Sequence, residues 1–248
     1  MKRAKNENPK VIICAAGRGK RLLPLTKNTP KVLIKIGGKT ILEHILDSIE
    51  ETRLVKEVVI IVGYKYRSIK KKIGRKYKNL KIFYVLNSVY ERSDNLYSLL
   101  LARNYFDRTT IFINGDTIFH PHILKAFIKD PKKDAVLVDF EQVIDNDSMR
   151  VKGKNGKLVA IGKRIKGSSD GNAFGMYKLS PQTGEQYLHF AEKYFRRGPR
   201  RGGFVVPLRS ISKEKPIWLV AAQSSLWAEI DTLEDVLQAK DRLKEIVF

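Results

Sequence analysis

The sequence predicts an α/β fold with one doubly wound, mostly parallel sheet, and two features of the 248 residues lead to this prediction. Apolar, β-branched runs at 11–15 and 58–62 alternate with a helical stripe of apolar residues at 41–51. Strands that are apolar on both faces and separated by helices are typical of parallel sheets covered on both sides. Right-handed crossovers wind such a sheet in both directions, and ligands bind at the carboxyl ends of its strands.

The same patterns predict the other elements along the chain. We expect strands at 11–15, 58–62, 81–86, 110–113, 135–140, 150–152, 158–161, 174–179 and 217–221. We expect helices at 41–51, 66–77, 95–105, 121–129, 183–195 and 232–246, with Ser93 or Asp94 and Thr232 as N-caps. The pair Asn155-Gly156 predicts a hairpin, so the second half holds inserted β-elements. No linker divides the chain, and a single domain over 1–248 is the simplest interpretation.

The composition limits the class of protein. The net charge is +22 and the isoelectric point is near 10.0, which fits nucleic-acid binding, an anionic small substrate or the lysine-rich surface of a heat-adapted protein. Cys14 is the single cysteine, so no intrachain disulfide can form and a reducing compartment is expected. No apolar run approaches the ~20 residues that cross a bilayer, and residues 1–10 lead into no signal-type apolar core. We therefore expect a cytoplasmic protein without a membrane segment.

The stretch 14–33, directly after the first strand, is small, positive and poor in regular structure. Gly17 and Gly19 let the backbone approach a ligand closely, while Arg21 and Lys31 are among its cationic side chains. Backbone amides together with arginine and lysine are the usual way to bind phosphates. The spacing is neither that of a Walker loop nor that of the dinucleotide fingerprint. The residues alone predict a phosphate site, with a solvated basic loop as the alternative.

Several segments resemble the nucleotidyltransferases that join a nucleoside triphosphate to a phosphorylated sugar or alcohol. Residues 15–33 match A-A-G-x-G-x-R-L-x-P-L-T-x-x-x-P-K-x-L, although Lys20 stands where many members carry a small residue. Residues 94–99 resemble the segment that closes over the base and triphosphate, and 114–116 and 227–232 resemble the two that supply metal-binding carboxylates. The resemblance implies the Rossmann-like sheet of the nucleotide-diphospho-sugar transferases. Its nucleotide-binding half would span about 10–130, and its acceptor-binding half about 131–248.

The resemblance also implies the residues of the site. Arg21 would hold the triphosphate, Lys31 would lie near the reacting phosphates, and Lys163 would hold the acceptor's phosphate, with a surface lysine as its equal alternative. Asp116 and Asp231, which both follow apolar runs and can meet at one sheet edge, would bind Mg²⁺ through carboxylate oxygens. Nucleotide binding is expected of Ala15, Ala16, Gly17, Gly19, Asn87, Asn95 and Ser98. Acceptor binding is expected of Asp139, Asn172 and Glu229.

The segments N-L-Y-S-L and W-x-E-I-D-T, in a chain this short, resemble the cytidylyltransferases, which implies CTP as the donor. Few aromatic residues lie between 135 and 175 to cage a quaternary ammonium, whereas Asp139, Glu141, Asp170 and Asn172 can bind hydroxyl groups. We therefore predict transfer of CMP to inositol 1-phosphate, with phosphocholine or aminoethylphosphonate as the close alternative. A sugar-1-phosphate thymidylyl- or uridylyltransferase and a non-catalytic nucleotide- or RNA-binding protein stay open. We expect no nucleic-acid partner, and a homodimer is left open.

Overall fold

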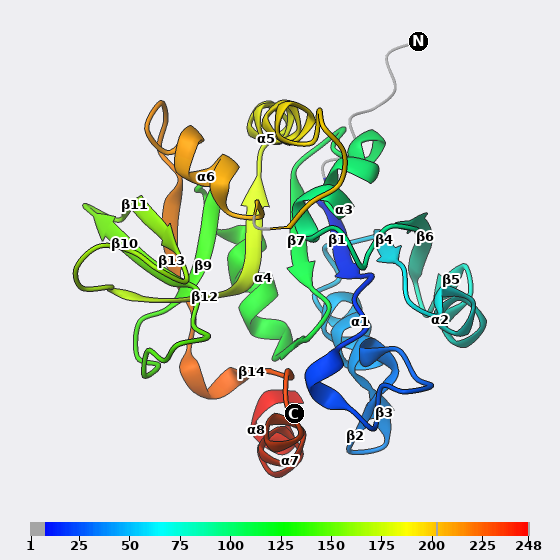
Figure 1. Cartoon of the computed structure of the whole chain (residues 1–248). Helices are drawn as coiled ribbons and strands as arrows, with labels where there is room; N and C mark the ends of the chain where they lie inside the picture. Colours follow the sequence, from blue (N-terminus) through cyan, green and yellow to red (C-terminus); the bar gives the residue numbers. More distant parts are fainter. Residues whose placement is uncertain (1–7, 202, 248) are drawn as a thin grey trace.

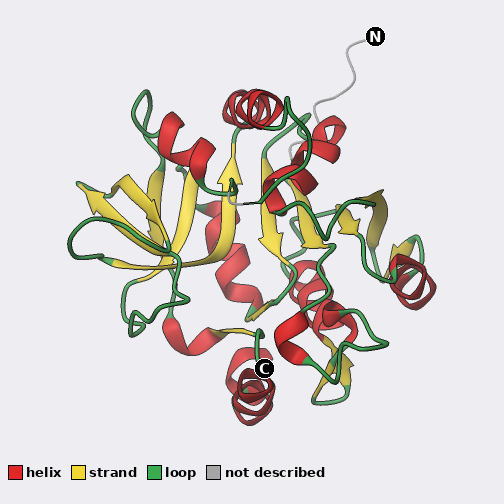
Figure 2. Cartoon of the chain, in the orientation of Figure 1, coloured by secondary structure: helices red, strands yellow, loops and turns green. Residues whose placement is uncertain are grey.

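A ten-stranded mixed sheet forms the centre of the molecule, and helices cover both of its faces (Figures 1 and 2). The computed structural model describes residues 8–201 and 203–247. The prediction that residues 1–10 form no signal sequence therefore lies mostly outside the described residues. Across the sheet the strands are β10 (Arg150–Lys154), β11 (Lys157–Gly162), β13 (Trp218–Ala221), β9 (Ala135–Asp139), β12 (Gly171–Leu179), β7 (Thr110–Asn114), β1 (Lys10–Ala15), β4 (Glu57–Val62), β6 (Leu80–Leu86) and β5 (Lys76–Tyr77).

The doubly wound α/β fold is confirmed, but the parallel arrangement is confined mainly to the first half of the chain. Strands β7, β1, β4 and β6 are neighbours and run parallel. In the second half, β12 runs antiparallel to both β7 and β9, and β10 and β11 form an antiparallel hairpin. No helix separates β9, β10, β11 and β12 in the described chain, and short connections of this kind join antiparallel strands.

Eight α-helices are described, and most begin where the sequence predicts. They are α1 (Ile41–Glu51), α2 (Tyr66–Ile73), α3 (Asn95–Leu101), α4 (Pro121–Lys129), α5 (Pro181–Tyr194), α6 (Val206–Ile211), α7 (Leu233–Asp241) and α8 (Leu243–Val247). None of these described helices is long and apolar enough to cross a membrane.

Three predicted helices are too long. Helix α2 stops at Ile73 because residues 76–77 pair with β6 as strand β5. Helix α3 gives way to a 3-10 turn at Arg103–Tyr105. The last helix is divided at Arg242, which caps the C-terminus of α7 before α8 begins at Leu243. Helix α6 had no periodic apolar stripe long enough to predict it.

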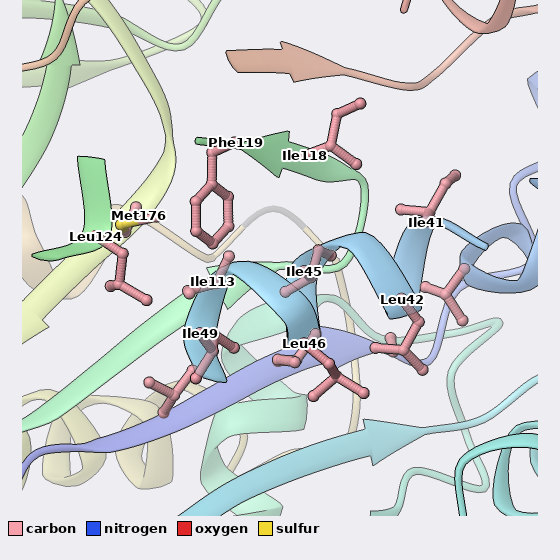
Figure 3. Close-up of a cluster of buried hydrophobic side chains, with 14 of the residues drawn as sticks. Ile41, Leu42, Ile45, Leu46, Ile49, Ile113, Ile118, Phe119, Leu124 and Met176 are labelled. Atoms are coloured by element: carbon pink, nitrogen blue, oxygen red, sulfur yellow. The ribbon is translucent and has the colours of Figure 1, made fainter. Parts of the chain in front are cut away.

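The core consists of two apolar clusters, one on each face of the sheet. Along β1, Val11, Ile13 and Ala15 belong to the cluster under α1, α2 and α4, while Ile12 and Cys14 belong to the cluster under α3, α5 and α6. Figure 3 shows the first cluster, in which the apolar stripe of α1 packs against β7 and α4. Because both faces are covered, β1 is buried along its whole length, and only its carboxyl end opens toward a ligand.

Replacing Ile45 with alanine tests this packing. Ile45 is 0% exposed in the middle of the α1 stripe, so Ile45→Ala should lower the free energy of unfolding by about 2–5 kcal/mol through lost burial and a cavity. Urea denaturation measures the change. The control Glu51→Ala, at the exposed end of the same helix, should change stability by less than about 0.5 kcal/mol. Equal losses in both variants would contradict this packing.

Candidate active site

The loop after β1 folds into a compact turn that presents two cations on one side. Arg21 lies in a 3-10 turn at Lys20–Leu22, and Lys31 lies in a second one at Lys31–Leu33. Gly19 has a left-handed backbone (φ +72°), and a side chain on it would meet the Cβ of Lys31 at 2.9 Å. Thr26 Oγ1 donates a hydrogen bond of 2.8 Å to the carbonyl oxygen of Gly19 and closes the turn. Position 19 therefore requires glycine, because its backbone is left-handed and because a side chain there would collide with the aliphatic part of Lys31.

A two-stranded ribbon brings Asp116 and Asp231 together across 115 residues of sequence. β8 (Thr117–Phe119) pairs antiparallel with β14 (Trp227–Glu229), and the amide of Ile230 donates to the carbonyl oxygen of Asp116 at 2.9 Å. On the other side of Asp116, Gly115 packs so closely on β1 that a side chain would approach the Cys14 carbonyl oxygen to 2.6 Å. Asp116 closely follows β7, and both aspartates line one cavity together with Cys14 and Ala15 at the end of β1. Figure 1 shows β14 near the carboxyl ends of β1 and β7.

The ammonium group of Lys31 lies between these two carboxylates. Its Nζ donates to Asp116 Oδ2 at 2.8 Å and to Asp231 Oδ1 at 2.5 Å, and its side chain is only 10% exposed. Burial alone would lower the pKa of Lys31, but the negative charges of Asp116 and Asp231 outweigh it and raise this pKa. Lys31 therefore remains a full positive charge and holds the loop against both carboxylate segments.

Glu229 joins the two aspartates in a group of three carboxylates. One oxygen from each of Asp116, Glu229 and Asp231 lies within 4.8 Å of the others. Desolvation, followed by the negative charges of Asp116 and Asp231, raises the pKa of Glu229 to about 8. Because its side chain is still exposed to solvent, we attribute the larger share to the two neighbouring charges.

These three residues fit a hard divalent cation. An all-oxygen donor set is what Mg²⁺ prefers, and one oxygen from each of the three carboxylates lies close enough to the others to share one ion. The sequence-based prediction named Asp116 and Asp231 as metal ligands and Glu229 as an acceptor residue. The geometry places Glu229 beside the two aspartates, so we add it to the candidate metal ligands.

A second chain of charges runs from Arg21 to Lys163 through Asp147. The Arg21 guanidinium donates to Asp231 Oδ2 at 2.6 Å and to Asp147 Oδ2 at 2.7 Å, and Lys163 Nζ donates to Asp147 Oδ1 at 2.9 Å. The hydrogen bond and charge of Lys163, followed by the charge of Arg21, lower the pKa of Asp147. The three predicted catalytic cations, Arg21, Lys31 and Lys163, thus belong to one connected network. The sequence did not predict Asp147, because it lies in Asp145-Asn146-Asp147-Ser148, a run that indicates only a turn.

Three neighbouring cavities open at this network, and Asp231 lines all of them. A cavity of about 320 Å³ lies along the loop after β1 and is lined by Arg21, Lys31 and Asp116. The cavities on the other side have volumes of about 310 and 670 Å³, and Asp147 and Glu229 line both. The arrangement can hold a polyphosphate on the loop side and a smaller phosphorylated molecule on the other.

The predicted acceptor residues differ in what their side chains can offer a ligand. Both Asp139 and Asn172 line the cavity of about 670 Å³. Asp139 already accepts hydrogen bonds from Trp227 Nε1 at 2.8 Å, from Ser224 and from the amides of Glu141 and Gln142. Asn172 is 3% exposed, and its Oδ1 has no partner among the described residues. Asn172 is therefore the better placed of the two to bind an acceptor.

The predicted nucleotide-binding residues fall into two groups. Ala15, Gly17, Gly19 and Asn95 line the cavity along the loop, and the Ala16 carbonyl oxygen accepts from the amide of Tyr64 at 3.0 Å. Asn87 and Ser98 are instead buried, and Asn87 Nδ2 donates to Ser93 Oγ and Ser98 Oγ, each at 3.0 Å. Their contact with a nucleotide stays a prediction, and in the structure they join the segment after β6 to the start of α3.

The fold and the site define a class of protein that binds phosphorylated ligands at the carboxyl ends of a doubly wound sheet. Residues 10–150, more than half of the chain, match the sequence pattern described as nucleotidyl transferase, so the chain belongs to the nucleotidyl transferase family.

Three curated relatives have similar sequences. A CMP-5'-(3-aminopropyl)phosphonate synthase of Streptomyces rubellomurinus is 33% identical over 51% of this chain and 20% of its own length. The bifunctional protein GlmU of Methanocaldococcus jannaschii is 31% identical over 94% of this chain and 53% of its own. A bifunctional IPC transferase and DIPP synthase of Aquifex aeolicus is 28% identical over 94% and 51%, respectively. The chain thus spans about half or less of the length of these relatives.

Two solved structures share the fold. The inositol-1-phosphate CTP transferase of T. maritima superposes with a TM-score of 0.78 at 22% identity, over 97% of this chain and 96% of that one. A CTP:phosphocholine cytidylyltransferase of Streptococcus pneumoniae superposes with a TM-score of 0.74 at 23% identity, over 95% and 99%. At these identities the likeness establishes the fold.

Replacing Lys31 with methionine tests the charge balance of the site. Without the ammonium, Asp116 and Asp231 face each other, and Lys31→Met should cost about 2 kcal/mol of stability in EDTA, less than for a fully buried pair because the cavity is open. Mg²⁺ should then raise the melting temperature of the variant more than that of the wild type. Thermal denaturation with and without Mg²⁺ measures both effects. The control Lys35→Met removes an exposed lysine nearby. A rise in melting temperature with Mg²⁺ that is smaller in Lys31→Met than in the wild type would contradict this charge balance.

Proposed function

We propose that this chain is a Mg²⁺-dependent cytidylyltransferase that transfers CMP from CTP to inositol 1-phosphate, forming CDP-inositol and pyrophosphate. The observation that carries the proposal is the meeting of Arg21, Lys31 and Lys163 with three carboxylates at the junction of the cavities. Positively charged side chains on both sides of the carboxylate group can bind the phosphates of two substrates. The carboxylates themselves can bind the Mg²⁺ that accompanies a nucleoside triphosphate.

The cations would neutralise and orient the phosphates of both substrates. Arg21 offers a planar fork for phosphate oxygens, and Lys31 offers a compact charge beside the reacting group. Lys163, 53% exposed at the end of β11, would hold the acceptor's phosphate from the opposite side. Mg²⁺ held by Asp116 and Asp231, with Glu229 beside them, would supply further charge neutralisation when bound.

The reaction needs no nucleophile from the protein. An oxygen of the acceptor's phosphate attacks the α-phosphorus of CTP, and the bond from that phosphorus to the oxygen bridging the β-phosphate breaks. Pyrophosphate leaves with the electron pair of that bond. The chain contributes position and electrostatic stabilisation, which are the main terms in transfers of this kind.

Asn172 supports a polyol as acceptor. Asn172 lines the cavity of about 670 Å³, and its Oδ1 is buried without a partner among the described residues. A turn of this side chain toward the cavity would let Oδ1 accept a hydrogen bond from a hydroxyl group. The inositol-1-phosphate CTP transferase of T. maritima and the IPC transferase of Aquifex aeolicus are similar over nearly the whole of this chain. These observations favour inositol 1-phosphate.

A cationic acceptor is the second candidate, and the charge of the same cavity favours it. In a chain of net charge +22, the cavity of about 670 Å³ is lined by many acidic residues, including Asp145, Glu229, Glu234 and Asp235. An ammonium group of an aminoalkyl phosphonate or of phosphocholine would be attracted there. The Streptomyces rubellomurinus relative, named for an aminopropylphosphonate, is consistent with this alternative.

Pyrophosphate release tests the proposal. The purified chain is incubated with Mg²⁺, each of CTP, UTP, dTTP, ATP and GTP, and a panel of inositol 1-phosphate, phosphocholine, aminoethylphosphonate and sugar 1-phosphates. Release with CTP and inositol 1-phosphate alone is expected. Release with CTP and an amino-alcohol acceptor would move the assignment to the second candidate, and release only with a sugar 1-phosphate would replace both. No release with any pair would contradict the proposed function.

Substitution of either aspartate should remove activity without unfolding the chain. Asp116→Asn and Asp231→Asn keep the shape of the side chain but remove a charge from the candidate metal group, so the rate of pyrophosphate release should fall by about 100-fold or more. The assay above measures the rate, and circular dichroism checks the fold. Asp241→Asn, on the exposed face of α7, is the matched control and should keep full activity. Activity within threefold of the wild type in both site variants would refute the metal assignment.

A further inference from the structure

The carboxylate of Asp147 lies where two cations from different parts of the chain converge. Arg21 approaches Asp147 Oδ2 at 2.7 Å from the loop after β1, and Lys163 approaches Oδ1 at 2.9 Å from the end of β11. Each oxygen therefore has its own cationic donor. This is the pattern in which arginine and lysine bind two oxygens of one phosphate group.

The position is also the boundary between the two sides of the site. Asp147 lines the cavities of about 670 and 310 Å³, whereas Arg21 lines the first of these and the cavity of about 320 Å³ along the loop. Under the proposed function, the acceptor's phosphate has to reach the α-phosphate of the nucleotide across this boundary. The Arg21–Asp147 pair lies at this boundary, where the phosphates of both substrates would meet.

The loop that carries Asp147 is held by its own turn, independently of these cations. Asp145 Oδ1 accepts from the amides of Asp147 and Ser148 at 2.9 and 2.7 Å, and the guanidinium of Arg150 donates to the Asp145 carbonyl oxygen at 3.0 Å. The Asp147 side chain itself is 65% exposed. Exposed ion pairs of this kind contribute little to stability. The carboxylate can thus leave the two cations without unfolding the loop.

We propose that Asp147 occupies the position of the acceptor's phosphate between Arg21 and Lys163 and competes with it, so that this carboxylate sets the affinity of the site for phosphoryl groups. The inference rests on the proposed function for the identity of the phosphate. A phosphate carries about −1.5 to −2 charges at pH 7 and more acceptor oxygens than a carboxylate, so it displaces Asp147, whereas a monoanion does not. Asp147 acts through Arg21 and Lys163 and is a positioning residue that favours dianionic acceptors.

Phosphate binding tests the inference without requiring turnover. Isothermal titration of inorganic phosphate at pH 7.5 and low salt compares the wild type with Asp147→Asn, which removes the charge and keeps the side-chain shape. Loss of the competing carboxylate should lower the dissociation constant of phosphate about five- to twentyfold. The decrease should be smaller at high salt, because salt screens the charges. Glu185→Gln removes an exposed negative charge on α5, away from the two cations, and should leave the constant within about twofold.

A double-mutant cycle separates competition from a general change of charge. In the Lys163→Gln background, Asp147→Asn should tighten phosphate binding by less than half as much, since one of the contested cations is gone. With the acceptor identified by pyrophosphate release, Asp147→Asn should also lower the KM for that acceptor. A merely structural role would raise the KM and lower the melting temperature.

Two results would overturn the inference. One is phosphate binding that is unchanged or weaker in Asp147→Asn, or unmeasurable in both proteins. The other is equally tighter phosphate binding in Glu185→Gln, which would mean that the effect comes from the net charge of the protein. Either result together with normal pyrophosphate release would refute the role of Asp147 alone. Tightening as expected in a chain that releases no pyrophosphate would instead refute the proposed function.

Discussion

The site depends on one ammonium group held between two carboxylates. Lys31 Nζ lies 2.8 Å from Asp116 and 2.5 Å from Asp231, and these residues come from three segments separated by 85 and 115 residues. At 10% exposure the lysine has little water to replace either partner. Loss of one partner would leave a charge uncompensated, so the three segments have to be built together.

The sheet supplies the geometry for this contact. The carboxyl ends of β1 and β7 lie side by side because the two strands are parallel, and they place the loop of Lys31 next to Asp116. The pairing of β8 with β14 then adds Asp231 and Glu229 from the far end of the chain. Gly115 permits the close approach that the first step needs. Backbone hydrogen bonds between the strands hold these segments in place, and Lys31 then orients the two aspartate carboxylates.

The sequence predicted strands β1, β4, β6 and β7 and helices α1 and α4 within one residue at each end, because their apolar runs end sharply in glycine, proline or capping residues. Helices α2 and α3 are shorter than predicted. It predicted Asp116 and Asp231 at one edge because both follow apolar runs. It could not predict that a ribbon joins them, since β8 and β14 have three residues each and show no periodicity. Asp147 was missed for a similar reason, because a lone aspartate in a turn has many ordinary uses.

The balance of charge explains how a chain of net charge +22 keeps an acidic site. In the loop after β1, Arg21 pairs with Asp231 and Lys31 with Asp116. Just after β11, Lys163 pairs with Asp147. Under the proposed function, phosphates and carboxylates are alternative partners for these cations. Binding of an anionic substrate then exchanges one set of ion pairs for another. The free energy needed to bring these charges together is supplied during folding, so the charged groups are already in position before a substrate binds.

At this lysine–carboxylate centre, the proposed reaction transfers the nucleotidyl group, through its α-phosphorus, from a nucleoside triphosphate to a phosphorylated acceptor. Following the reaction of CTP and the acceptor by ³¹P NMR in the presence of Mg²⁺ tests it most directly. We expect two coupled resonances from a new P–O–P linkage between the α-phosphorus and the acceptor's phosphorus, together with pyrophosphate. Unchanged spectra, or release of inorganic phosphate without a new linkage, would contradict it.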